Sequence, residues 1–183
     1  LQLNPKRLQS LLNAGMRAIT VSLDGLENSH NWLRNNSSSF KNAIETIHLL
    51  SKVPDLKFDV VTCVNGKNFN ELSEIKELLL LKGVKEWRLF TIFPIGRAMQ
   101  HDELQLSPVK FKRFFDFIAS ERKKGDILLN YGCEGFLGNY EGEVRDNLFF
   151  CRAGINVASV LIDGSISACP NLRENFVQGN IYT

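Results

Sequence analysis

The 183-residue sequence lacks several features that would place it in a specialised class of protein. It has no apolar run long enough to cross a membrane, no start that reads as a signal peptide, and no basic stripe or acidic tail. The net charge is +2 with both signs interspersed, which argues against nucleic acid and membranes as partners. With 44% hydrophobic and 23% charged residues, the composition is that of one globular domain, or one domain with a small appendix.

Cysteine is also scarce, with four residues in the chain. Four cysteines are too few for the disulfide framework of a small secreted protein, and they indicate a reducing compartment, the cytoplasm. In such a compartment a cluster of cysteines more often binds a metal than forms disulfides. Three of the four, Cys133, Cys151 and Cys169, lie in the last third of the sequence.

The segment from Cys151 to Cys169 has the pattern of a β-hairpin. Asp163-Gly164 lies between two strand-like runs, and this dipeptide is a strong signal for a tight turn. A hairpin would hold its two ends, and with them the two cysteines, near each other. Thiols in that arrangement can form a disulfide, bind zinc or hold an iron–sulfur cluster, and the pattern alone leaves these alternatives open.

The first two thirds of the sequence alternate between strand and helix patterns. Strands are predicted at residues 17–23, 58–64, 86–92 and 127–130. Helices are predicted at residues 4–13, 37–51, 70–83 and 107–125, with Asn70 as the cap of the third. This alternation is typical of βαβ units around a parallel sheet, in which ligands bind at the carboxyl ends of the strands.

Residues 131–150 differ in composition: they are rich in glycine and aromatic residues and show no helical period. They are predicted to form an irregular loop that leads into the hairpin, and long loops of this kind are usually functional or disordered. The sequence starts at Leu1 rather than at methionine and stops without a closing element, so we expect it to be a piece of a longer protein.

Three motifs together resemble one family. The first motif is Ser22-Leu23-Asp24-Gly25, followed by His30 and Arg34, and it resembles the fourth-strand region of radical S-adenosylmethionine enzymes. The second motif is the IFPIG of residues 92–96, which resembles the end of their sixth strand. The third motif is a spacing: twelve residues separate Cys151 from Gly164, and four separate Gly164 from Cys169. This spacing resembles the opening half of the SPASM extension, a module that binds auxiliary [4Fe–4S] clusters. The segment at residues 178–181 is similar to the one that follows there.

The resemblance implies an α/β fold in two parts. Residues 1–130 would form the C-terminal half of a partial (βα)6 TIM-like barrel, with strands four to six and their helices. Residues 131–183 would form the irregular loop and the hairpin that begin a SPASM-like extension. The CxxxCxxC motif that binds the catalytic cluster in the family is absent from the sequence, and so is the second half of the SPASM cysteine set.

For function, the resemblance implies a parent oxidoreductase that cleaves S-adenosylmethionine reductively, abstracts hydrogen from a peptide or protein substrate, and uses [4Fe–4S] clusters. Without the CxxxCxxC motif this chain alone is expected to be inactive. Pro170 stands where sulfatase-maturing members carry an aspartate, which argues against that particular activity.

By the same resemblance Ser22 and Arg34 would bind S-adenosylmethionine. A hydroxyl can hydrogen-bond the ribose or the amino group, and a guanidinium can pair with the methionyl carboxylate. The alternatives are an ordinary strand-end hydroxyl for Ser22 and a solvated surface charge for Arg34. Asp24 is favoured as a turn residue. For His30 the alternatives are contact with the cofactor and a solvated histidine, and the second is favoured.

Cys151 and Cys169 would be ligands of the auxiliary cluster, with Cys133 as a third. Because such a cluster takes four thiolates, a fourth would come from outside this sequence. Cys63, inside a predicted strand, is favoured as a core residue.

Two other classes of function stay open. One is a zinc-binding α/β module with Cys133, Cys151 and Cys169 as ligands. The other is a non-catalytic interaction domain on a degenerate barrel. The sheet edge where the family's third strand would pair also predicts that the isolated piece forms dimers.

Overall fold

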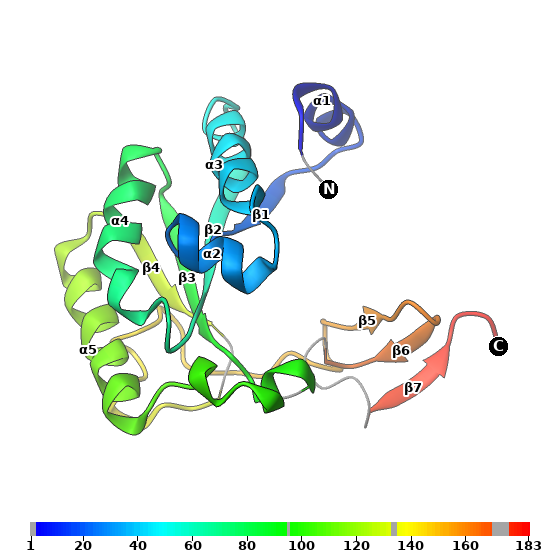
Figure 1. Ribbon diagram of the computed structural model, residues 1–183. Coiled ribbons are helices and arrows are strands. Elements are labelled where there is room, and N and C mark those ends of the chain that lie inside the picture. The colour runs from blue at the N-terminus through cyan, green and yellow to red at the C-terminus, as the bar shows by residue number, and fades with distance from the viewer. Residues whose placement is uncertain (1–2, 95, 133–134, 170–175) are drawn as a thin grey trace. The chain divides into compact units, whose positions relative to one another are not determined.

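The computed structural model describes residues 3–94, 96–132, 135–169 and 176–183 (Figure 1). The chain divides into two compact units, Leu1–Leu148 and Phe149–Thr183. The segment that follows the fourth strand packs with the first unit. Val144 is fully buried there, and its carbonyl accepts a hydrogen bond of 2.8 Å from the amide of Tyr131. A functional boundary at residue 130 stays a prediction.

The first unit is built on a sheet of four parallel strands in the order β1-β2-β3-β4. The strands are β1 (Ala18–Ser22), β2 (Lys57–Val64), β3 (Glu86–Thr91) and β4 (Leu128–Tyr131). All four coincide with strand patterns in the sequence, so the predicted parallel α/β architecture is confirmed. Because the strands are parallel, their carboxyl ends all lie at the same end of the sheet.

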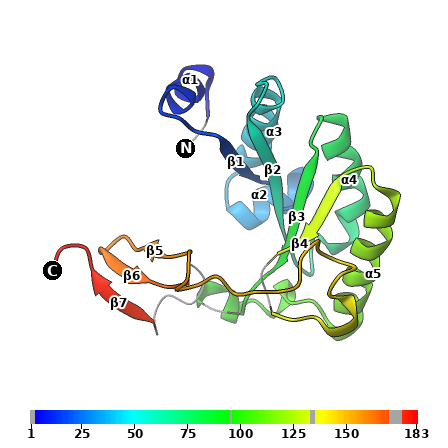
Figure 2. The same cartoon turned by 180° about the vertical axis from the view of Figure 1, so that it is seen from behind.

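Four of the helices also follow the sequence pattern. They are α1 (Pro5–Asn13), α3 (Ser39–Leu50), α4 (Leu72–Leu81) and α5 (Pro108–Lys124). Asn4 and Ser107 cap α1 and α5 through their side-chain oxygens, each before a proline at the first helical position. Helices α3, α4 and α5 lie on one face of the sheet, and Figure 2 shows the strands in front of them. Within the described ranges, no helix combines the length and the apolar character needed to cross a membrane.

Two local features differ from the sequence pattern. A further helix, α2 (Glu27–Arg34), follows β1, where the sequence indicates no helix. Asn70 does not cap a helix: it lies inside the 3₁₀ helix η1 (Phe69–Glu71), and α4 begins directly after it without a side-chain cap. In both places the backbone is held by hydrogen bonds between residues distant in sequence, Leu26 with Glu71 and Asp24 with Asn68.

Side chains alternate across the strands between a helix-covered face and an opposite face. In β2, Val60, Thr62 and Val64 are buried, while Val61 and Cys63 are half-buried. The indole of the fully buried Trp87 donates a hydrogen bond of 2.8 Å to the hydroxyl of Thr62, which satisfies both polar groups inside the core. Cys63 therefore lies on the face opposite the helices, and its predicted place in the core is wrong.

Short 3₁₀ helices connect the later elements: η2 (Gly96–Gln100), η3 (Asp102–Leu104) and η4 (Gly138–Tyr140). η3 packs directly on the loop after β2, where the amide of Gly66 donates a hydrogen bond of 3.2 Å to the carbonyl of Leu104. A Cβ at position 66 would lie 2.2 Å from the carbonyl oxygen of Glu103, so only glycine permits this approach.

The second unit is a small antiparallel sheet of β5 (Ser159–Val160), β6 (Ser165–Ser167) and β7 (Val177–Asn180). β5 and β6 form the predicted hairpin around Asp163-Gly164. Gly164 adopts a φ of +82°, and the amide of Ser165 donates to a side-chain oxygen of Asp163 at 3.0 Å. β7 pairs with β6 and has no counterpart among the predicted strands.

Candidate S-adenosylmethionine site at the carboxyl end of the first strand

Ser22 is the last residue of β1, on the face opposite the helices. Its neighbours Val21 and Leu23 are buried in the core and fix the end of the strand. Within the described parts of the chain the hydroxyl of Ser22 makes no hydrogen bond, and the side chain is half-buried. The Ser22 hydroxyl is therefore available as a hydrogen-bond donor and acceptor at the carboxyl end of the strands, where parallel sheets bind ligands.

Gly25 allows the chain to turn sharply from β1 into α2. Its φ is +150°, and a Cβ there would lie 2.8 Å from the Cβ of Ser29 and 2.9 Å from a carboxylate oxygen of Glu71. This close approach lets Glu71 accept hydrogen bonds from the amide of Leu26 at 2.8 Å and the hydroxyl of Ser29 at 2.5 Å. A carboxylate from η1 thus holds the amino end of α2, which explains why the local sequence does not indicate this helix.

Asp24 is a buried anchor as well as a turn residue. Its side chain is 1% exposed, and one carboxylate oxygen accepts a hydrogen bond of 2.9 Å from the amide of Cys63. Its backbone carbonyl accepts a hydrogen bond of 2.7 Å from the side-chain amide of Asn68. These contacts tie the end of β1 to the end of β2.

Arg34 pairs with the other carboxylate oxygen of Asp24. The Nε atom donates to this oxygen at 2.7 Å, and the Nη2 atom contacts the same oxygen. The Arg34 side chain is 41% exposed, whereas Asp24 is buried, so one side of the guanidinium is held while the rest faces solvent. Arg34 is therefore an oriented cation and not the freely solvated charge of the alternative interpretation.

His30 lies beneath this ion pair and is 1% exposed, so the solvated histidine that the sequence favours is wrong. Its Nδ1 atom accepts a hydrogen bond of 2.9 Å from the amide of Asp24, and its Nε2 atom lies 3.0 Å from the hydroxyl of Ser39. Burial is the main reason why the pKa of His30 is lowered; nearby Asp24 raises it and Arg34 lowers it further. The ring is thus neutral near pH 7.

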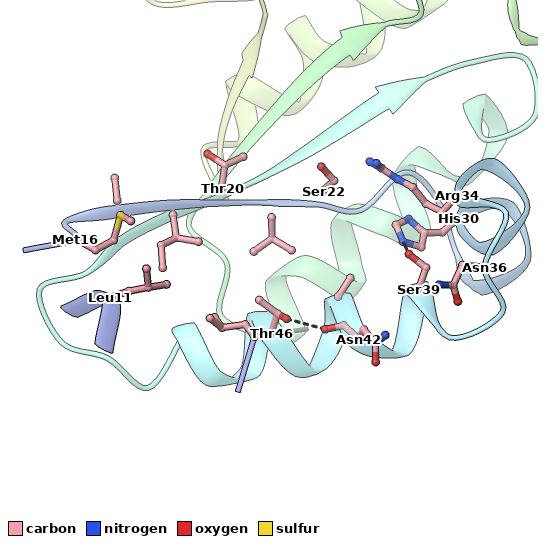
Figure 3. A pocket seen from close by; sticks show the side chains of 15 residues that line it. Leu11, Met16, Thr20, Ser22, His30, Arg34, Asn36, Ser39, Asn42 and Thr46 are labelled. Atoms are coloured by element: carbon pink, nitrogen blue, oxygen red, sulfur yellow. Dashed lines mark hydrogen bonds between the residues drawn. The ribbon is translucent and has the colours of Figure 1, made fainter. Parts of the chain in front are cut away.

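A pocket of about 540 Å³ lies beside β1, and both predicted cofactor ligands line it (Figure 3). Ser22 comes from β1 and Arg34 from the end of α2, and Figure 3 shows the guanidinium end turned toward Ser22 on the same side of the strand. His30, Ser39 and further residues of β1, α1 and α3 also line it. The two residues, twelve positions apart in the sequence, meet at one cavity.

Two residues of this site, Asn68 and Glu71, are not among those that the sequence predicts. Both lie in the connection between β2 and α4, and both bind backbone groups at the turn after β1. Asparagine and glutamate are common at helix starts, so their types alone give no signal. Only the parallel pairing of β1 with β2 brings them to the site.

The cysteines of the second unit are free thiols. Cys151 is exposed and Cys169 is half-buried, and neither forms a disulfide. Cys133, the third predicted ligand, lies outside the described residues. Within the ranges that the structure describes, no group of three or more His, Cys, Asp or Glu side chains is arranged to hold a metal ion. The cluster ligands stay a prediction.

The chain is similar to known proteins in sequence and in fold. No protein-family model matches the chain. The AdoMet-dependent heme synthase of Methanosarcina barkeri is 28% identical over 132 residues, which cover 72% of this chain and 37% of that protein. The sporulation killing factor maturation protein SkfB of Bacillus subtilis is 27% identical over 95 residues, or 52% of this chain and 23% of SkfB. The chain is related to the radical S-adenosylmethionine enzymes.

The fold agrees with that of solved radical S-adenosylmethionine enzymes. The structure of anSMEcpe with bound AdoMet and the Kp18Cys peptide has a TM-score of 0.66, 17% identity, and coverage of 98% of this chain and 52% of that one. Streptococcus suis SuiB bound to S-adenosylmethionine has a TM-score of 0.59, 13% identity, and coverage of 89% of this chain and 39% of SuiB. The expected partial-barrel fold is confirmed, and the chain spans about half or less of each of these radical enzymes.

Proposed function

We propose that Ser22 and Arg34 hold S-adenosylmethionine beside β1, in an enzyme that uses this cofactor to remove a hydrogen atom from a peptide or protein. The observation that carries the proposal is the pairing of Arg34 with buried Asp24 next to the unbonded hydroxyl of Ser22, in one pocket. Of the proteins similar to this chain, anSMEcpe and SuiB have been solved with this cofactor, and SuiB also with its precursor peptide SuiA.

The residues present suit the cofactor. The methionyl group of S-adenosylmethionine ends in a carboxylate and an amino group, and its ribose carries two hydroxyls. The guanidinium of Arg34 keeps its Nη1 atom without a partner among the described residues, so it can donate to the carboxylate while Asp24 fixes its direction. The Ser22 hydroxyl can bond the amino group or the ribose.

S-adenosylmethionine held by Ser22 and Arg34 would supply hydrogen-abstraction chemistry, with an iron–sulfur cluster as the source of the electron. The four cysteines of this chain contain no CxxxCxxC motif, so the cysteines of the catalytic cluster would have to lie outside these residues. This chain's own part is to bind and orient the cofactor. Cytoplasmic location fits this proposal, because iron–sulfur clusters and free thiols need a reducing compartment.

Cofactor binding is tested by calorimetric titration of the chain with S-adenosylmethionine. We expect saturable binding that Arg34→Gln weakens about tenfold or more and Ser22→Ala weakens several-fold, because each substitution removes a hydrogen bond, a charged one for Arg34. Arg17→Gln is the matched control, since Arg17 stands at the opposite end of β1 and is exposed. Equal affinity of all four proteins would refute the assignment of these two residues.

Hydrogen abstraction is tested on the complete gene product, purified without oxygen. Reduced protein should convert S-adenosylmethionine to 5′-deoxyadenosine and methionine, and the Arg34→Gln variant should do so with a raised KM for the cofactor. A complete product that lacks the CxxxCxxC motif, or that forms no 5′-deoxyadenosine when reduced, contradicts the proposed activity.

We also assign Cys151, Cys169 and Cys133 to an auxiliary [4Fe–4S] cluster. Cys151 and Cys169 are free and flank the predicted hairpin, which supports a role as ligands. Reconstitution of the complete product with iron and sulfide should give a brown protein whose iron content falls in Cys151→Ala and Cys169→Ala. Cys63→Ala, outside the second unit, should keep its iron. Stoichiometric zinc with no visible absorption would favour the zinc module instead.

A further inference from the structure

The imidazole of His30 has a defined tautomer in this structure. A backbone amide can only donate, and the amide of Asp24 points at Nδ1 from 2.9 Å, so Nδ1 must carry a lone pair. The proton of the neutral ring is therefore on Nε2, which donates to the hydroxyl of Ser39 at 3.0 Å. Both ring nitrogens are satisfied, and the ring is 1% exposed.

The same hydrogen bond fixes Asp24. The other polar groups of Asp24 are each held by a different element: its carboxylate by the Cys63 amide and by Arg34, and its carbonyl by Asn68. His30 secures the remaining backbone amide. Because the carboxylate of Asp24 aims Arg34, a shift of the backbone at Asp24 would change the direction of the guanidinium.

We propose that neutral His30 is a positioning residue, which holds Asp24 and through it Arg34 in the arrangement that binds the cofactor, so that protonation of His30 weakens cofactor binding. The inference rests on the proposed cofactor site. A proton on Nδ1 would face the amide of Asp24, donor against donor, and would break this hydrogen bond. His30 makes no direct contact with the cofactor in this account.

The charged groups around the ring decide how readily it takes up a proton. The nearer carboxylate oxygen of Asp24 lies 3.9 Å from Nδ1 and favours the charged ring, whereas Arg34 on the same helix opposes it. Glu71 of η1 is already bonded to the first turn of α2. Helix α3 contributes the hydroxyl of Ser39 and the ring of Phe40, whose centroid is 6.2 Å away. Burial outweighs the attraction of Asp24 and keeps the pKa below the usual 6.5.

The test compares two substitutions of one histidine. His30→Asn places a non-titrating amide oxygen where Nδ1 stands, whereas His30→Gln reaches toward Ser39 and leaves the Asp24 amide without its acceptor. Affinity for S-adenosylmethionine is measured by equilibrium dialysis from about pH 7.5 to about pH 5.5.

We expect the affinity of the wild type to fall about tenfold over this range, with the midpoint of the fall below pH 6.5. His30→Asn should bind as the wild type does at the upper pH and lose little at the lower.

His30→Gln should bind about tenfold more weakly throughout, because the Asp24 amide is unpaired at every pH. His48→Asn is the matched control, since His48 is exposed on α3, and it should keep the wild-type profile. If the wild type and His30→Asn weaken in parallel on acidification, the proposal is wrong.

A second measurement needs no cofactor. The ¹⁵N spectrum of the His30 ring in the wild-type chain should show the Nε2–H tautomer near pH 7, and the Arg34 Nε–H signal should exchange faster with water in His30→Gln. An Nδ1–H tautomer, or unchanged exchange at Arg34, overturns the positioning role. Absence of cofactor binding at every pH, with the tautomer and exchange as expected, would instead refute the proposed function.

Discussion

At the scale of single residues, the candidate site depends on side chains that accept hydrogen bonds from the backbone, on a glycine that permits close contact, and not on the two proposed ligands alone. His30 and Glu71 accept hydrogen bonds from backbone amides at the turn after β1, and Asp24 accepts one from the amide of Cys63 in β2. Gly25 leaves the space that Glu71 occupies beside this turn. Ser22 and Arg34 can present polar groups to the pocket because these buried contacts fix the backbone between them.

Gly25→Ala is expected to destabilise the fold by at least about 2 kcal/mol, because it combines an unfavourable φ with contacts under 3 Å. Gly15→Ala is the control, since Gly15 also has a positive φ, +90°, but nothing lies within 4 Å of its Cβ position. That substitution should cost about 1 kcal/mol. Urea unfolding of both variants measures the difference, and equal losses would contradict the role given to close packing at Gly25.

The Asp-Gly turn follows from a local pattern, and the resemblance to the family points to Ser22 and Arg34, which stay a prediction as ligands; the solvated histidine predicted at position 30 is wrong. A histidine between polar residues in a short segment looks solvated. It becomes buried because α2 folds back over the end of β1 and α3 supplies Ser39 and Phe40. The acceptor for its Nε2 proton lies nine residues away in a different helix, which no local pattern encodes.

At the scale of elements, α4 and α5 are joined by a buried ion-pair cluster. Lys76 of α4 donates to Glu121 of α5 at 2.6 Å and to Asp126 at 2.8 Å, and the side chains of Lys76 and Glu121 are each 8% exposed. Burial alone would raise the pKa of Glu121, but hydrogen bonds from Lys124 and Lys76 outweigh it and hold the pKa below its usual range. For Lys76, burial lowers the pKa and the two carboxylates raise it above its usual value.

Because the folded pKa of Glu121 is depressed, its contribution to stability is present at neutral pH and is lost as the pH falls below about 4.5. Lys76→Met should destabilise the protein by about 2–4 kcal/mol near pH 7, since it leaves Glu121 buried with one fewer partner. It should also reduce the loss of stability between about pH 5 and about pH 3. Urea unfolding across this range checks both effects, and a variant with the wild-type pH slope would contradict them. Lys41→Met, in an exposed pair, is the control.

The sequence predicts those helices and strands whose own residues carry a cap, an apolar stripe or a terminating glycine. Helix α5 has a Ser-Pro start, an apolar stripe and a glycine at its end, and its predicted limits agree with the structure. Helix α2 has few apolar residues and depends on Glu71 for its amino end. Strand β7 is exposed over most of its length and exists through its pairing with β6, so its sequence carries little strand signal.

At the scale of the whole molecule, the sheet of the first unit has β1 at one edge and β4 at the other. An edge strand presents unpaired backbone groups, and the isolated chain is therefore expected to form dimers as its concentration rises. Sedimentation velocity over a hundredfold range of concentration measures this. A chain that remains monomeric throughout, with the circular dichroism of an α/β fold, would contradict the expectation.

The overall architecture was accessible from sequence because alternating strands and helices allow few topologies. The two proposed cofactor ligands could be predicted only through the resemblance of a short motif, and the contacts that support their pocket are evident only in the structure. The relation to radical S-adenosylmethionine enzymes rests on sequence and fold together. The chain is 28% identical to the AdoMet-dependent heme synthase over 72% of its length, and its fold agrees with that of anSMEcpe.

The most direct test of the account is to locate the cofactor on the chain. A ¹⁵N-labelled sample is titrated with S-adenosylmethionine, and the amide of Ser22 and the Nε–H of Arg34 are followed. We expect both signals to shift together and saturably, while the Nε–H of Arg17 at the other end of β1 does not move. Shifts that leave Ser22 and Arg34 unchanged, or no shift at any concentration, would contradict the central claim that these two residues hold the cofactor.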